Sequence, residues 1–140
     1  MTIHPAPAGM VRMMVYGTLK RGFGPNRLMQ SPTTVYHGKM HTVNPYILID
    51  GGFPGFSLSQ HDEWREHLRP VIGEVYDVPE SNLPAIDSYE GHPSLFARTD
   101  GFVVEDSNGN QTTVSMYVYN HAEPGHKLAP VVDGMYEWSR

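Results

Sequence analysis

The chain has 140 residues, a formal net charge of −5 at pH 7 and no cysteine. This length suits one domain that can bury a core without a metal or disulfide to stabilise it. The absence of cysteine excludes thiol nucleophiles, Cys-ligated zinc and disulfides. The ten Lys and Arg residues are scattered, and no apolar run is long enough to span a bilayer, so neither nucleic acid nor membrane is expected as a partner.

The first ten residues (MTIHPAPAGM) contain two prolines and a glycine. They lack the basic and apolar regions of a signal peptide, so we expect a flexible N-terminal arm over residues 1–10. A single domain is expected over residues 11–140. A cytoplasmic location fits this N-terminus and the lack of cysteine.

A β-strand is predicted from Val11 to Tyr16, and its apolar residues do not alternate with polar ones, which is typical of a central strand. The strand ends at Gly17, where a glycine permits a tight turn or a close approach to a ligand. A turn just after a strand can expose successive backbone N–H groups that bind an anion. An ordinary strand-to-turn junction is the alternative. The following loop, up to Asn26, is irregular by its glycine and proline content.

The middle of the chain is β-rich. A second glycine-rich turn over residues 51–56 places Phe53 on a backbone that can approach another group closely. Residues 59–69 are polar and charged around one tryptophan, and are expected to form an exposed helical turn or a mobile insertion. The predicted strands in this part cover residues 33–40, 44–50 and 71–78.

One helix is predicted over residues 82–90. Ser81 is the expected N-cap, and Pro84 falls in the first turn, where its missing N–H is not needed. Gly91 stands where a left-handed residue commonly ends a helix. The helix is therefore bounded on both sides by sequence signals.

Two further strands are predicted over residues 97–105 and 112–119, and Asn108-Gly109 between them is a strong hairpin signal. The tail from His121 onward is expected to be mostly loop. Several short strands, one helix and long loops indicate an α+β fold with a small, partly closed antiparallel or mixed sheet.

Glu90 is the candidate catalytic carboxylate. At a helix C-terminus it faces the negative end of the helix dipole, and nearby aromatics would add desolvation. Both effects raise a carboxyl pKa toward the range of a general base. The alternative is a solvated glutamate at a frayed helix end. Asp87, one turn earlier, is expected to be an exposed acidic side chain, with a place on the same face as Glu90 as the alternative. Arg98 is either a site cation or an edge charge.

Metal and nucleotide chemistry have no support in the sequence. The eight histidines have loop spacings or, for His37 and His41, a strand spacing that chelates poorly, and no H-E-x-x-H motif is present. No G-x-S-x-G, G-x-G-x-x-G or phosphate-loop motif occurs. No metal and no cofactor are therefore expected.

An ordered set of short motifs resembles the γ-glutamylcyclotransferase superfamily, and most closely its γ-glutamylamine cyclotransferase (AIG2-like) branch. The resemblance covers about residues 11–120. It begins with Tyr16-Gly17-Thr18-Leu19-Lys20-x-Gly22 followed by Asn26 and continues through Gly52-Phe53-Pro54, Gly73-Glu74-Val75-Tyr76, Asp87-x-x-Glu90-Gly91, Phe96-x-Arg98 and Tyr117-Val118-Tyr119.

The resemblance implies a small mixed β-barrel with flanking helices. It also implies that the α-amine of a small γ-glutamyl substrate attacks its own γ-carbonyl, which forms 5-oxoproline and releases an amine. Glu90 matches the catalytic glutamate. The matching substrate-binding residues are Tyr16, Gly17, Thr18, Leu19, Asn26, Phe53, Arg98 and Tyr119. The resemblance requires no metal or other cofactor.

The chain departs from the family pattern at several places. Gly24-Pro25 looks like a one-residue extension of the loop, and Phe96 stands where many relatives have tyrosine. Residues 59–69 and the tail match nothing in the pattern, and both are candidates to line the leaving-group side. Two alternatives stay open: a non-catalytic binding module with the same fold, and the same chemistry on another γ-glutamyl conjugate such as a peptide or metabolite.

Overall fold

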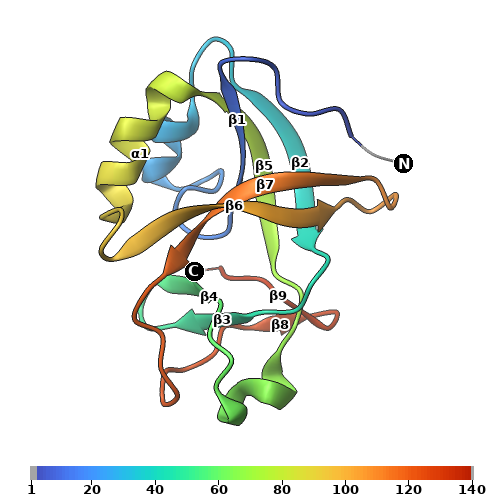
Figure 1. Ribbon diagram of the computed structural model, residues 1–140, viewed down its shortest axis with the longest axis vertical. Helices are drawn as coiled ribbons and strands as arrows, with labels where there is room; N and C mark the ends of the chain where they lie inside the picture. Colours follow the sequence, from blue (N-terminus) through green and yellow to red (C-terminus); the bar gives the residue numbers. More distant parts are fainter. Residues whose placement is uncertain (1–2, 140) are drawn as a thin grey trace.

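A closed five-stranded barrel forms the centre of the protein in the computed structural model, which describes residues 3–139 (Figure 1). Strand β1 lies between two partners, antiparallel to β5 and parallel to β7 where Met13 faces Ser115. The barrel is therefore mixed, as the sequence predicts, and fully closed. Around the barrel the order is β1 (Met10–Val15), β5 (Ile72–Pro79), β2 (Val35–Thr42), β6 (Phe96–Glu105) and β7 (Gln111–Tyr119).

Two small sheets lie at one end of the barrel, in the lower part of Figure 1. One pairs β3 (Ile47–Asp50) with β4 (Pro54–Ser57), so the glycine-rich turn is shorter than expected and gives way to a strand at Pro54. The other pairs β8 (Val131–Val132) with β9 (Met135–Tyr136), two short strands that the sequence did not indicate in the tail.

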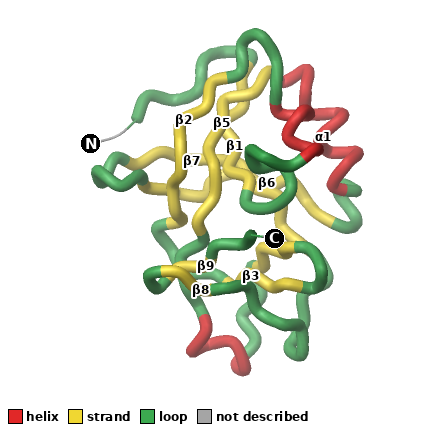
Figure 2. Tube along the Cα trace, turned by 180° about the vertical axis from the view of Figure 1, so that it is seen from behind, coloured by secondary structure: helices red, strands yellow, loops and turns green. Residues whose placement is uncertain are grey.

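One α-helix, α1 (Leu83–Glu90), lies beside the barrel, and Figure 2 shows it from behind. Gly91 ends it in the left-handed conformation, with φ 67°, as predicted. The predicted N-cap is wrong, because Ser81 lies inside a preceding 3-10 turn, η3 (Glu80–Asn82), and no side chain caps α1. Two more 3-10 helices are η1 (Gly24–Met29) and η2 (Asp62–His67). None of the described helices has the length and apolar character needed to cross a membrane.

Both faces of β1 are buried, which explains its non-alternating sequence. Met14 packs into the barrel interior, while Met13 and Val15 belong to a second apolar cluster. Successive strand residues point to opposite faces, so one strand serves two cores. Ile86 on α1 joins the second cluster, which fixes the helix against the outside of the barrel.

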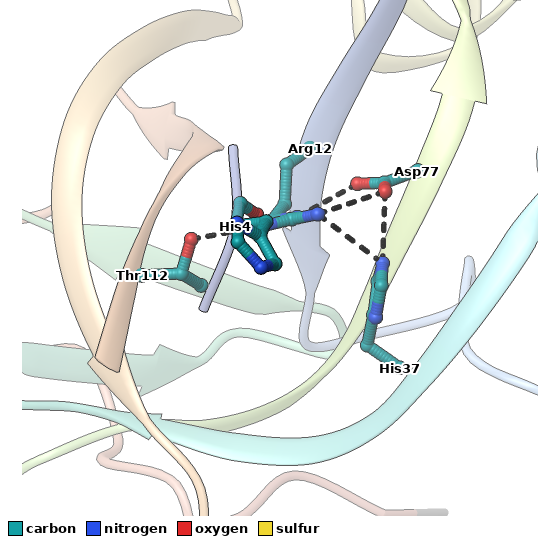
Figure 3. Close-up of polar contacts among 5 residues, drawn as sticks. All are labelled: His4, Arg12, His37, Asp77 and Thr112. Atoms are coloured by element: carbon teal, nitrogen blue, oxygen red, sulfur yellow. Dashed lines mark hydrogen bonds and ion pairs between the residues drawn. The ribbon is translucent and has the colours of Figure 1, made fainter. Parts of the chain in front are cut away.

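A buried ionic cluster ties four barrel strands together (Figure 3). Arg12 Nε and Nη2 donate to the two carboxylate oxygens of Asp77 at 2.8 and 2.9 Å. Asp77 also contacts His37 Nε2 at 2.8 Å. Arg12 Nη1 donates to Thr112 Oγ1 at 3.0 Å and to the backbone carbonyl of His4. The buried charges are thus paired, as burial demands, and the segment before β1 is held against the barrel.

Candidate active site

A cavity of about 400 Å³ lies where the loop after β1 meets the end of α1 and the strands β6 and β7. The structure brings together in it most of the site residues predicted from the sequence: Tyr16, Gly17, Thr18, Leu19, Phe53, Glu90 and Tyr119. Two predicted residues, Asn26 and Arg98, do not line it. Lining residues that the sequence interpretation did not assign to the site include Pro54, Tyr89, Leu95 and Tyr117.

The loop after β1 comes into direct contact with β4. A Cβ atom added at Gly17 would lie 2.5 Å from Pro54 Cγ, so only glycine fits without displacement. The Lys20 N–H closes the turn onto the Gly17 carbonyl at 3.0 Å. The N–H groups of Gly17, Thr18 and Leu19 donate to no acceptor within residues 3–139. All three residues line the cavity, so the loop has N–H groups available to an anion, as an anion site requires.

Tyr16 and Asn26 hold this loop in place. The Tyr16 hydroxyl donates to the Tyr117 carbonyl at 2.7 Å and accepts the Phe56 N–H at 3.2 Å. Its burial raises the pKa of the Tyr16 phenol above its usual value. Asn26 lies outside the cavity and donates from Nδ2 to the Leu19 carbonyl at 2.7 Å. The polar groups of both side chains are thus engaged by the protein itself.

Glu90 is the last residue of α1 and a lining residue of the cavity. Its carboxylate makes no hydrogen bond or ion pair with any other described residue. Burial raises the pKa of Glu90 from 4.5 to about 7. A carboxyl group with a pKa near neutrality can accept a proton and return it at physiological pH.

Tyr117, which lines the cavity, forms a network with Asp87 and Arg98, which do not. Arg98 donates to the two oxygens of Asp87 from Nε at 2.9 Å and from Nη2 at 3.2 Å. The Tyr117 hydroxyl donates to Asp87 Oδ1 at 2.5 Å. Although burial opposes ionisation, the hydrogen bonds from Arg98 and Tyr117 hold the pKa of Asp87 below its usual value. The expectation of an exposed acidic side chain at position 87 is wrong, because this carboxylate is paired.

Aromatic rings form part of the cavity wall. Phe53 and Phe96 each contact Tyr119, with ring centroids 5.2 and 5.1 Å apart. At the rim, Thr18 Oγ1 and the Tyr89 hydroxyl share a hydrogen bond of 2.7 Å. Apart from Glu90, none of the described lining residues carries a charged side chain. The site is an apolar pocket with one isolated carboxylate and a row of backbone donors.

Two segments were not assigned to the family pattern in the sequence, residues 59–69 and the tail, and their described residues do not line the cavity. Within residues 59–69, Trp64 is buried against Ile47 and Ile49. In the tail, the Trp138 ring packs on Phe23 at 5.7 Å, and its carbonyl accepts a hydrogen bond from Lys20 Nζ at 2.5 Å. The tail therefore supports the loop after β1 from outside the cavity.

No group of three or more His, Asp or Glu side chains within residues 3–139 is placed to hold a metal ion. The protein is therefore a small closed mixed barrel with a cavity in which Glu90 is the one carboxylate among the described lining residues. The family profile "Gamma-glutamyl cyclotransferase, AIG2-like" matches residues 13–139. The chain belongs to this family.

Individual relatives agree with the family assignment. A protein from Rattus norvegicus named gamma-glutamylaminecyclotransferase is 32% identical over 120 residues, which cover 81% of this chain and 79% of that protein. A human protein of the same name is 35% identical over 98 residues, covering 64% of this chain and 60% of its own length. The crystal structure of an AIG2-like protein from Mus musculus superposes with a TM-score of 0.70 at 23% identity, covering 94% of this chain and 97% of that one. This last likeness supports the fold.

Proposed function

We propose that the protein is a cyclotransferase that acts on L-γ-glutamyl amines and releases 5-oxoproline and a free amine. The observation that carries the proposal is Glu90, a carboxylate with a pKa raised to about 7 that lines the same cavity as the unpaired N–H groups of the loop after β1. The names of the rat and human relatives support an amine as the leaving group.

Ring closure requires little covalent chemistry from the protein. The amine and the carbonyl belong to one molecule, so the site must hold a productive conformer and move protons. In the proposed sequence, Glu90 accepts a proton from the α-ammonium, and the freed amine attacks the γ-carbonyl carbon. The C–N bond of the ring forms, and negative charge develops on the carbonyl oxygen. As the old C–N bond breaks, Glu90 returns this proton to the departing nitrogen. The ring nitrogen, which still carries two hydrogens, loses one of them through Glu90 as well, so the lactam keeps one N–H and the amine departs as an ammonium ion.

The N–H groups of Gly17, Thr18 and Leu19 supply the complementary electrostatics. They would bind the α-carboxylate or the developing oxyanion, and preorganised donors of this kind act without reorganisation in a site that excludes water. The aromatic wall would then contact the leaving amine. Because no cationic side chain among residues 3–139 lines the cavity, a leaving group with its own carboxylate would gain no ion pair with these residues.

The test is product formation by the purified protein. It is incubated with γ-glutamyl alkylamines, γ-glutamyl-ε-lysine and γ-glutamyl amino acids, and 5-oxoproline is quantified by mass spectrometry. We expect 5-oxoproline from the γ-glutamyl alkylamines and from γ-glutamyl-ε-lysine. Product from γ-glutamyl amino acids alone would refute the proposed substrate class. No product from any member of the panel would refute the enzyme and leave a binding module.

A further inference from the structure

The single proton of the Tyr117 hydroxyl group is directed toward a carboxylate. A tyrosine hydroxyl has one donor and two acceptor positions. The donor is directed to Asp87 Oδ1 at 2.5 Å. Tyr117 also lines the cavity that holds Glu90. What its oxygen offers to a bound molecule is therefore lone pairs only.

Asp87 is held as an ionised acceptor by Arg98. Arg98 and Tyr117 face each other across the β6–β7 ladder, so both side chains reach the same carboxylate on α1. Arg98 donates two bonds to it in the fork geometry that arginine forms with carboxylates. The pair thus keeps the Tyr117 proton directed away from the cavity.

Glu90 follows Asp87 by three residues on α1, and side chains at this spacing are neighbours on a helix surface. The charge of Glu90 also acts on Tyr117, whose pKa is raised by burial first and additionally by Asp87 and Glu90. The cavity therefore contains two acceptors: the Glu90 carboxylate, which can take a proton, and the Tyr117 oxygen, which can only accept a hydrogen bond.

We propose that the Tyr117 hydroxyl oxygen accepts a hydrogen bond from the substrate's α-amino group, and that Asp87 and Arg98 position it as an acceptor. An α-ammonium has three N–H donors. One delivers its proton to Glu90, while a second, bound to Tyr117, holds the nitrogen beside the γ-carbonyl, toward which the freed lone pair then turns. The inference rests on the proposed function, and it gives Arg98 an indirect role in place of direct substrate contact.

The test compares the substrate with its desamino analogue, the glutaric monoamide of the same amine. The analogue lacks the α-amino group and cannot cyclise, so it serves as a competitive inhibitor. In Tyr117→Phe we expect the KM of the substrate to rise about tenfold or more, as for loss of a hydrogen bond to a charged group, with the Ki of the analogue unchanged. Equal changes in both constants, or an unchanged KM, would overturn the proposal. Tyr136→Phe is the matched control, because this buried hydroxyl also donates to a single acceptor, the His67 carbonyl, outside the cavity.

The positioning role of Asp87 is tested by a double-mutant cycle. Asp87→Asn alone should raise KM, since an amide can present its own donor and let the tyrosine proton turn toward the cavity. In the Tyr117→Phe background, Asp87→Asn should raise KM no further, because Asp87 acts through the Tyr117 hydroxyl. Additive losses would refute the positioning role. The activity of the unchanged protein distinguishes failure of this inference from failure of the proposed function. If the unchanged protein forms 5-oxoproline and Tyr117→Phe does not alter its KM, this inference alone is refuted. If the unchanged protein forms no product, the proposed function and this inference are both refuted.

Discussion

The contact between Gly17 and Pro54 provides a sharp test of how the site is built. In Gly17→Ala the new Cβ would lie 2.5 Å from Pro54 Cγ, which is about 1 Å closer than ordinary van der Waals contact. Pro54 is buried at the start of β4, so the loop after β1 must move instead. Overpacking of this kind costs about 1–3 kcal/mol of folding free energy.

The expected effect on activity is larger than the effect on stability. A displacement of about 1 Å in groups that orient a substrate can lower a rate about 100-fold. We therefore expect a large fall in kcat/KM for 5-oxoproline formation, together with a modest fall in Tm measured by calorimetry. Gly24→Ala is the control, because a Cβ at Gly24 meets nothing within 4 Å. A Gly17→Ala variant with unchanged kcat/KM would refute the role assigned to the close approach.

Three further predictions follow from the titration of Glu90 and from the tail. The pH profile of kcat/KM should fall below about pH 7, because Glu90 must be ionised to accept a proton; a flat profile down to pH 5 would contradict this. Since the pKa of Glu90 is raised from 4.5 to about 7 in the folded state, the contribution of its bound proton to stability is fully present below pH 4.5 and is lost as pH rises through 7, above which the ionised carboxylate destabilises the fold. Glu90→Gln should thus be more stable than the unchanged protein at pH 8 by about 1–3 kcal/mol, with the difference vanishing near pH 4 in denaturant titrations. Trp138→Ala should raise KM, because the Trp138 ring packs against Phe23 beside the loop after β1; a lower Tm with an unchanged KM would show that the tail contributes to stability alone.

Local sequence signals correctly predicted the turns and helix ends whose backbone conformation depends on one or two residues. Asn108-Gly109 gave the β6–β7 hairpin, and Gly91 gave the end of α1, because each needs a backbone conformation that few residues adopt. The central position of β1 also followed from its pattern. The Ser81 cap failed because a 3-10 turn precedes α1, and nothing in the local sequence distinguishes that turn from a helix start.

The site itself was predictable in its two halves but not in its supporting contacts. The loop after β1 and Glu90 were predicted from local residue features and from family motifs, and the structure places both on one cavity. The Asp87 pair with Arg98 and Tyr117 depends on the register of β6 and β7, which fixes side chains far apart in the chain on one face. The parallel contact of β1 with β7 that closes the barrel depends on long-range pairing in the same way. Contacts between strands far apart in the chain cannot be predicted from a local sequence pattern.

The central claim is that Glu90 moves the protons of ring closure. The most direct measurement is 5-oxoproline formation by Glu90→Gln beside Glu80→Gln, which alters an exposed glutamate at the other end of the helical segment. We predict that Glu90→Gln lowers kcat by about 10²–10⁴-fold, as for loss of a general acid–base group, while Glu80→Gln retains the activity of the unchanged protein. Glu90→Gln that forms 5-oxoproline at the rate of the unchanged protein would contradict the claim.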